Sequence, residues 1–194
     1  GPAADPNYLV GREGNFVSVV VDHWVGAGTL DRAVAHFKNP NAKVSAHFIV
    51  GTTGRIVQVV GEVNTAYHAG NFDVNLISIG IEHEATPDLP PSDALYAASA
   101  WLHAKLASDF GITLAAGVTV RPHRDIIPTE CPGTLDLARI VKEANDLYVT
   151  LEMFEQYKAA LEKQLNEQYV RKDEVVKYHE HDVPLSGVVT AGPK

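Results

Sequence analysis

The chain has 194 residues, of which 45% are hydrophobic and 21% charged, and its formal net charge is −8. These fractions exclude wholesale disorder, and the length suits one domain of roughly 150 residues with an appendage. The single cysteine excludes an intrachain disulfide, and no apolar run reaches the ~20 residues of a membrane span. The acidic balance argues against a nucleic-acid partner, because phosphate binding needs clustered Lys and Arg.

Residues 1–13 are predicted to be an N-terminal arm outside the main domain. Gly1-Pro2 resembles the scar of a cleaved expression tag. Gly1–Asp5 has neither the basic region nor the apolar run of a signal peptide, so we expect no leader in this chain. An export signal removed earlier is an alternative that the sequence leaves open.

Predicted strands and helices alternate from Phe16 onward. β-Branched and apolar runs predict strands at about Phe16–Val21, Val44–Val50, Ile56–Val60, Ile77–Glu82 and Val118–Val120. Capping residues and apolar stripes predict helices at about Thr29–Phe37, Ser92–Phe110 and Leu135–Leu147. Gly80 inside a predicted strand indicates a bulge or the close approach of another group.

This order of elements predicts an α/β fold in which helices flank a single sheet. The second and third strands flank the turn Gly51–Gly54 and are expected to form a hairpin, so the sheet is predicted to be mixed. We assign residues 14–147 to this domain.

The composition changes after residue 147. Leu151, Phe154, Leu161 and Leu165 follow an amphipathic spacing, interrupted by Lys158, that predicts a C-terminal helix over residues 148–170. This helix either docks on the domain or makes the protein a homo-oligomer, and the sequence favours neither. Residues 171–194 are polar and are predicted to be a tail or linker.

Three side chains in predicted loops or at strand ends form a candidate metal site. His23 closes the first strand, whereas His123 and Cys131 lie in the polar loop after the last strand. Two imidazoles and one thiolate are a Zn²⁺ ligand set that leaves a fourth position open to water. On spacing alone, a structural histidine and a buried cysteine are the commoner interpretation.

Six motifs in order carry a resemblance to a known family. They are Val44–Val50, Gly54–Gln58, Ala66–Gly70, Asn75–Glu82, Pro122–Ile126 and Cys131–Gly133. Over about Phe16–Leu147 the chain resembles the zinc-dependent N-acetylmuramoyl-L-alanine amidases of the type-2 family. That family includes phage endolysins, bacterial amidases that recycle muropeptides and animal peptidoglycan recognition proteins.

The resemblance implies a Zn²⁺ ion bound by His23, His123 and Cys131. It implies hydrolysis of the amide between N-acetylmuramic acid and L-alanine in peptidoglycan, with zinc-bound water as nucleophile and Glu82 as general base. Some relatives carry a lysine at the position of Thr129, where it stabilises the oxyanion. We expect the hydroxyl of Thr129 to share that role here.

His68, Trp24 and Asn64 are the candidate substrate-binding residues. For His68 a structural hydrogen bond is a close alternative, and Trp24 could instead fill the core. The expected partner is peptidoglycan, through its glycan strand and stem peptide. We expect a bacteriolytic, antimicrobial enzyme at the bacterial cell wall, released from the host cytoplasm as a phage endolysin or exported with a leader since removed.

Two other functions remain open at this point. A peptidoglycan-binding module without catalysis is one, although relatives that lost activity usually lack the cysteine. A cysteine hydrolase using Cys131 is the other, but no helix N-terminus follows the thiol to lower its pKa.

Overall fold

The computed structural model describes residues 2–147, 156, 158–160 and 162–163. The chain divides into two compact units, residues 1–150 and residues 151–194. The predicted tail over residues 171–194 lies outside the described residues, as does most of the predicted helix over 148–170. In the second unit, residues 156, 158–160 and 162–163 are helical.

A five-stranded mixed sheet forms the centre of the first unit, as predicted. Its order is β4-β3-β6-β2-β7, with β3, β6, β2 and β7 parallel and β4 antiparallel to β3. The strands are β2 (Val19–Trp24), β3 (Phe48–Val50), β4 (Ile56–Gln58), β6 (Ser78–His83) and β7 (Val120–Pro122). A separate two-stranded antiparallel sheet pairs β1 (Tyr8–Leu9) with β5 (Thr65–Ala66).

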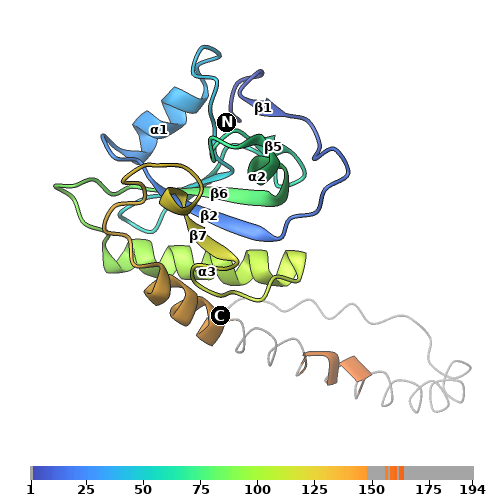
Figure 1. The fold of residues 1–194 in the computed structure, drawn as a ribbon. Coiled ribbons are helices and arrows are strands. Elements are labelled where there is room, and N and C mark those ends of the chain that lie inside the picture. The colour runs from blue at the N-terminus through green and yellow to red at the C-terminus, as the bar shows by residue number, and fades with distance from the viewer. Residues whose placement is uncertain (1, 148–155, 157, 161, 164–194) are drawn as a thin grey trace, which may run out of the picture. The chain divides into compact units, whose positions relative to one another are not determined.

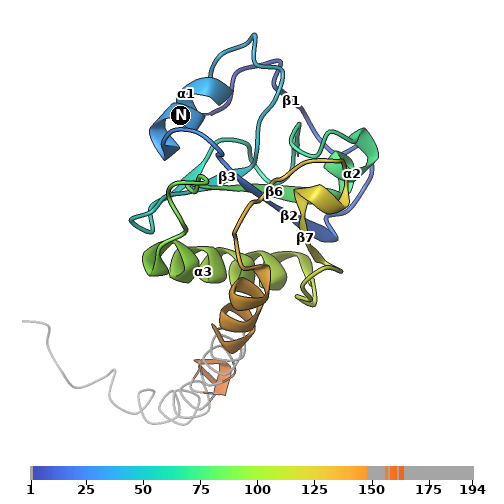
Figure 2. The same ribbon diagram turned by 60° about the vertical axis from the view of Figure 1, so that its left-hand side comes forward.

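Helices lie on both sides of the five-stranded sheet (Figure 1; Figure 2). α1 (Leu30–Phe37) and α2 (Phe72–Ile77) lie on one side, and α3 (Asp93–Phe110) covers the other. A short 3-10 helix, η1 (His123–Asp125), follows β7, and a further helix runs over residues 137–147. Within the part of the chain that the structure describes, no helix is both long and apolar enough to cross a bilayer.

The predicted capping residues begin the helices. Thr29 and Ser92 accept hydrogen bonds from the backbone N–H groups of Arg32 and Leu95, which satisfies donors that a helix start leaves free. Gly111 ends α3 in the left-handed region at φ 66°. α2 and its cap Asn71 were not predicted, because six residues carry too little periodicity.

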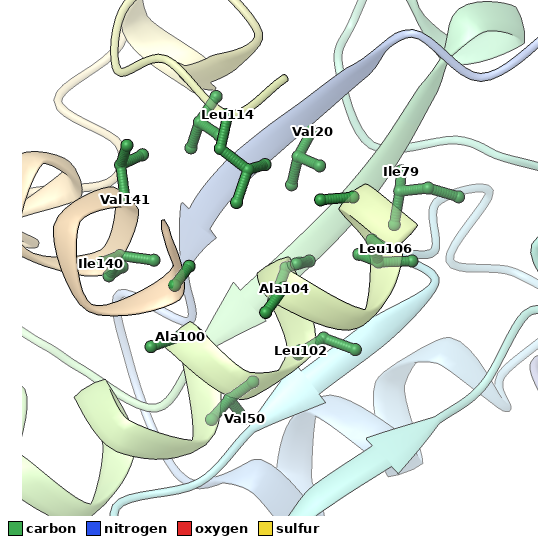
Figure 3. Packing of buried hydrophobic residues seen from close by; sticks show 14 of the residues in the cluster. Val20, Val50, Ile79, Ala100, Leu102, Ala104, Leu106, Leu114, Ile140 and Val141 are labelled. Atoms are coloured by element: carbon green, nitrogen blue, oxygen red, sulfur yellow. The ribbon is translucent and has the colours of Figure 1, made fainter. Parts of the chain in front are cut away.

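The main hydrophobic core lies between α3, the helix over 137–147 and one face of the sheet (Figure 3). Val20 and Ile79 from adjacent strands meet Leu102 and Leu106 from α3, and Ile140 packs beside them. A smaller core lies under α1 on the opposite face. Val20 of β2 points toward α3. Because side chains alternate along a strand, Val21 and His23 point to the opposite face of the sheet.

Candidate active site

The carboxyl ends of the central parallel strands bring the predicted site residues together. In the register of β2 and β6, His23 lies beside Glu82. β7 pairs with the other edge of β2, and His123 follows it directly. In open α/β sheets, this end of parallel strands is where binding sites form.

His23, His123 and Cys131 form one compact cluster. Each offers a ligand atom, and these atoms all lie within 4.8 Å of one another. The Nδ1 atom of His23 lies 3.7 Å from the sulfur of Cys131, and the two imidazole centroids are 4.4 Å apart. His23 and Cys131 are buried, whereas His123 is half-buried and leaves the cluster open on one side.

The loop that carries Cys131 is fixed against β2. The N–H of Arg124 donates to the carbonyl of Cys131 at 2.9 Å. Two residues further on, Gly133 lies so close to the Trp24 ring that a Cβ there would meet it at 2.1 Å. Only glycine allows this contact, which holds the thiol next to the strand that carries His23.

Burial controls the protonation of the cluster. It lowers the pKa of His23 to about 3 and raises the pKa of Cys131 to about 12. The imidazole is therefore neutral, with a lone pair available, whereas the buried thiolate needs a cation beside it.

The donor set and its spacing fit a tetrahedral zinc ion. With Zn–N of about 2.1 Å and Zn–S of about 2.3 Å, tetrahedral ligands stand about 3.6 Å apart. The Nδ1 of His23 and the sulfur of Cys131 already lie 3.7 Å apart. The second imidazole is also turned suitably, because the Nε2 of His123 donates to the carbonyl of Ala69 at 3.2 Å and leaves Nδ1 without a proton.

Glu82 stands beside this cluster as an unpaired carboxyl group. The residue is half-buried, and its Oε2 atom is enclosed without a hydrogen-bond partner among the described residues. Loss of hydration raises the pKa of Glu82 to about 8. A carboxyl group whose pKa is brought near neutrality can both accept and return a proton.

A pocket of about 410 Å³ opens between Glu82 and α1. Arg32 and His36 from α1 line it, together with the apolar residues Val25, Ala27, Ala33, Phe37 and Val44. The side chain of Arg32 is exposed, and no carboxylate of the described residues pairs with it. The pocket thus brings the carboxyl group of Glu82 to an apolar wall that also carries the positive charge of Arg32.

The remaining predicted site residues occupy different positions. Thr129 lies in the Cys131 loop, where its hydroxyl oxygen accepts from the N–H of Cys131 at 3.2 Å. Trp24 is half-buried against Gly133. Asn64 accepts from the N–H of Gly11 at 3.0 Å and so ties the N-terminal segment to the turn before β5. Substrate binding by Trp24 and Asn64 stays a prediction.

His68 is buried beside His23. Only 9% of it is accessible, and its Nδ1 atom lies 3.0 Å from the Nε2 of His23. Its neighbour on the other side, Ser78, was not predicted as a site residue. The alternation of Ser78, Gly80 and Glu82 on one face of the predicted strand was a signal that could have indicated it.

This fold and cluster define a class: an α/β domain with a candidate metal-hydrolase site at the carboxyl ends of its parallel strands. Residues 8–134 match the N-acetylmuramoyl-L-alanine amidase family of type 2, and the chain belongs to this family.

Individual relatives agree with this assignment. N-acetylmuramoyl-L-alanine amidase A of Achromobacter lyticus is 38% identical over 84 residues, which are 43% of this chain and 45% of that relative. The match thus spans less than half of the relative's length. The crystal structure of a selenomethionine derivative of AmpD has 28% identity and a TM-score of 0.60, over 74% of this chain and 92% of that one.

AmiD from E. coli shares the fold, with a TM-score of 0.56 and 24% identity over 72% of this chain and 60% of that one. That protein was solved in complex with the substrate anhydro-N-acetylmuramic acid-L-Ala-D-γ-Glu-L-Lys.

Proposed function

We propose that this protein is a zinc-dependent N-acetylmuramoyl-L-alanine amidase that cleaves peptidoglycan between the lactyl group of N-acetylmuramic acid and L-alanine. The observation that carries the proposal is the compact cluster of His23, His123 and Cys131 beside the unpaired carboxyl group of Glu82. The identity of the cleaved bond is inferred from membership of the amidase family.

His23, His123 and Cys131 would hold the zinc ion through two nitrogens and one sulfur. Bound there, zinc supplies Lewis acidity, which activates water and polarises a carbonyl group. His123 is only half-buried, so we expect substrate to approach the zinc ion from its side.

Glu82 acts as general base and then as general acid. Its carboxylate accepts a proton from the water molecule as the water oxygen bonds to the amide carbon. The same proton passes to the nitrogen as the carbon–nitrogen bond breaks, so the alanine amine leaves neutral and Glu82 is again a carboxylate. No other proton source is needed for this balance.

Thr129 contributes a hydrogen bond to the carbonyl oxygen of the substrate. Its own oxygen already accepts from the N–H of Cys131, so the hydroxyl proton remains free to be donated. A hydroxyl brings no charge, which makes it a weaker stabiliser of an oxyanion than a lysine would be.

The test combines metal content with a matched pair of variants. Dialysis against a chelator should abolish release of L-alanine amino groups from peptidoglycan, and added Zn²⁺ should restore it. Glu82→Gln should lower kcat by about 10²-fold or more, because the base is lost. Glu130→Gln, which changes an exposed carboxylate in the Cys131 loop, should remain within about twofold of the parent.

Two results would contradict this function. Binding to cell walls without any release of amino groups would identify a non-catalytic module. Full activity of Glu82→Gln would remove the assigned base. Thiol alkylation separates the third alternative, since a cysteine hydrolase would be inactivated even after zinc loading.

We further propose a lytic role at the bacterial cell wall, as in an endolysin. Intact peptidoglycan and soluble anhydro-muropeptides separate this role from recycling. A lytic enzyme clears intact cell walls, whereas preference for the soluble compounds alone would assign the protein to recycling.

A further inference from the structure

We propose that His68 is a positioning residue, which with Ser78 fixes the ring of His23 so that its Nδ1 atom faces the metal. This inference rests on the proposed zinc site. It places His68, a candidate substrate-binding residue, at the Nε2 atom of His23, whereas Cys131 lies at its Nδ1 atom.

The direction of the first hydrogen bond follows from Ser78. Its hydroxyl lies 2.6 Å from the carbonyl oxygen of Val74, which can only accept, so Ser78 donates there. The same oxygen lies 3.0 Å from the Nε2 of His68. Because its proton is already used, the serine oxygen accepts, and the proton of His68 is placed on Nε2.

The position of the proton on His68 also determines the direction of its hydrogen bond with His23. His68 is buried, and in its neutral form with the proton on Nε2 it presents a lone pair at Nδ1. The Nδ1 of His68 lies 3.0 Å from the Nε2 of His23. His23 therefore donates through Nε2, which leaves the Nδ1 lone pair directed toward Cys131, 3.7 Å away.

The ring of His68 is held in place by the strand below it. A Cβ atom on Gly80 would lie 2.4 Å from the Cγ of His68, so the ring packs directly on the backbone of β6. The side chain of Asn75 accepts from the backbone N–H groups of His68 and Ala69, at 3.2 and 2.8 Å. These contacts leave the ring little freedom to turn away from His23.

One short segment orients both candidate histidine ligands. His68 accepts from the Nε2 of His23, and the next residue, Ala69, accepts through its carbonyl from the Nε2 of His123. Both ligands thus present Nδ1 to the cluster. Metal-bound histidines generally need such a partner, and its loss typically costs 10–100-fold in metal affinity.

The experiment measures zinc affinity of the full chain by competition with a chromophoric chelator, which does not depend on activity. His68→Ala should weaken zinc binding by about 10–100-fold. His68→Asn, whose amide oxygen can replace the Nδ1 acceptor, should recover most of that loss. Ser78→Ala should weaken binding by a smaller factor, because His68 can then carry its proton on either nitrogen.

Ser45→Ala is the matched control. Ser45 is also a buried serine whose hydroxyl donates to a backbone carbonyl, of Asn7 at 2.7 Å, but it contacts no histidine. It should lose similar stability and keep the parent's zinc affinity. Nitrogen-15 NMR of the zinc-loaded protein should show His23 and His68 with protons on Nε2.

The outcomes separate this inference from the proposed function. Unchanged zinc affinity in His68→Ala and Ser78→Ala, or a proton on the Nδ1 of His23, would overturn the positioning role even in an active amidase. Weakened zinc binding in a protein that cleaves no amide would uphold the role and refute the amidase. If His68→Ala does not fold, Ser78→Ala and His68→Asn decide.

Discussion

At the scale of single residues, Arg32 is the pocket-lining charge that the catalytic proposal does not use. It lines the pocket with Glu82 and has no acidic partner among the described residues. A guanidinium group pairs well with a carboxylate, so we propose that Arg32 binds a free carboxylate in the stem peptide of the proposed substrate.

We predict that Arg32→Gln lowers kcat/KM by about fivefold on a soluble muropeptide whose stem peptide has a free glutamate carboxylate, corresponding to about 1 kcal/mol for an exposed ion pair. On the same compound with the glutamate amidated, parent and variant should agree within about twofold. Arg55→Gln is the control, since Arg55 is an exposed arginine paired with Asp31 and does not line the pocket. Equal losses of kcat/KM on both substrates would show that Arg32 does not bind the carboxylate.

Through the family resemblance, the sequence indicated the members of the candidate metal cluster but not the network around them. His23, His123 and Cys131 stand at recognisable strand ends and in a motif of known type. The position of His68 depends on the register of β6, on the missing side chain of Gly80 and on the turn at Asn75. Such contacts between segments cannot be derived from local patterns, because alternation gives a face but not a partner.

At the scale of elements, a buried ion pair joins β2 to α3 behind the candidate site. The Nε2 of His103 lies 3.3 Å from a carboxylate oxygen of Asp22, and both side chains are fully buried. His83 completes the group, donating to the carbonyl of His23 at 2.8 Å and contacting Ser99 of α3. The strand that carries His23 is therefore anchored to α3.

The charges of this pair depend on each other. Burial opposes both charges, but their mutual attraction outweighs it, so the pKa of Asp22 lies below 3.8 and that of His103 above 6.5. The stabilisation from Asp22 is present above pH 3.8 and is lost as the pH falls through its lowered pKa. The stabilisation from His103 is present below pH 6.5 and is lost as the pH rises through its raised pKa.

We predict that His103→Gln lowers the free energy of unfolding by about 3 kcal/mol near pH 5.5, since it leaves a buried carboxylate unpaired. The difference from the parent should shrink as the pH rises above 6.5. Urea unfolding at several pH values measures both effects. Lys105→Gln, which breaks an exposed pair on α3, should cost less than about 1 kcal/mol; an equal, pH-independent loss in both variants would contradict the ion-pair argument.

Elements with strong local signals were the ones that sequence reasoning predicted correctly. α3 has a serine cap, a glycine end and 18 residues between them. β1, β5 and α2 were missed, because two or six residues hold no measurable period and their pairing partners are far away in the chain. The hairpin was found because its Gly-rich turn is local, and it correctly indicated a mixed sheet.

At the scale of the whole molecule, the sheets, α1 to α3 and the candidate site all belong to the first compact unit, residues 1–150. We predict that a chain ending at Leu147 keeps the zinc affinity of the full chain and its Tm within a few degrees, because every element around the cluster precedes that point. Calorimetry and zinc competition measure this. A large fall in Tm would show that residues beyond 147 stabilise the domain by docking on it.

Light scattering on the same two chains decides the role of the predicted helix over 148–170. If that helix joins copies through its apolar stripe, the full chain should have a multiple of the monomer mass and the chain ending at Leu147 should be a monomer. An unchanged state of assembly would exclude self-association through this segment.

Because all the proposed catalytic residues lie in the first unit, kcat on a soluble muropeptide should be the same for both chains. Activity on intact cell walls should fall only if association increases the number of contacts with the polymer.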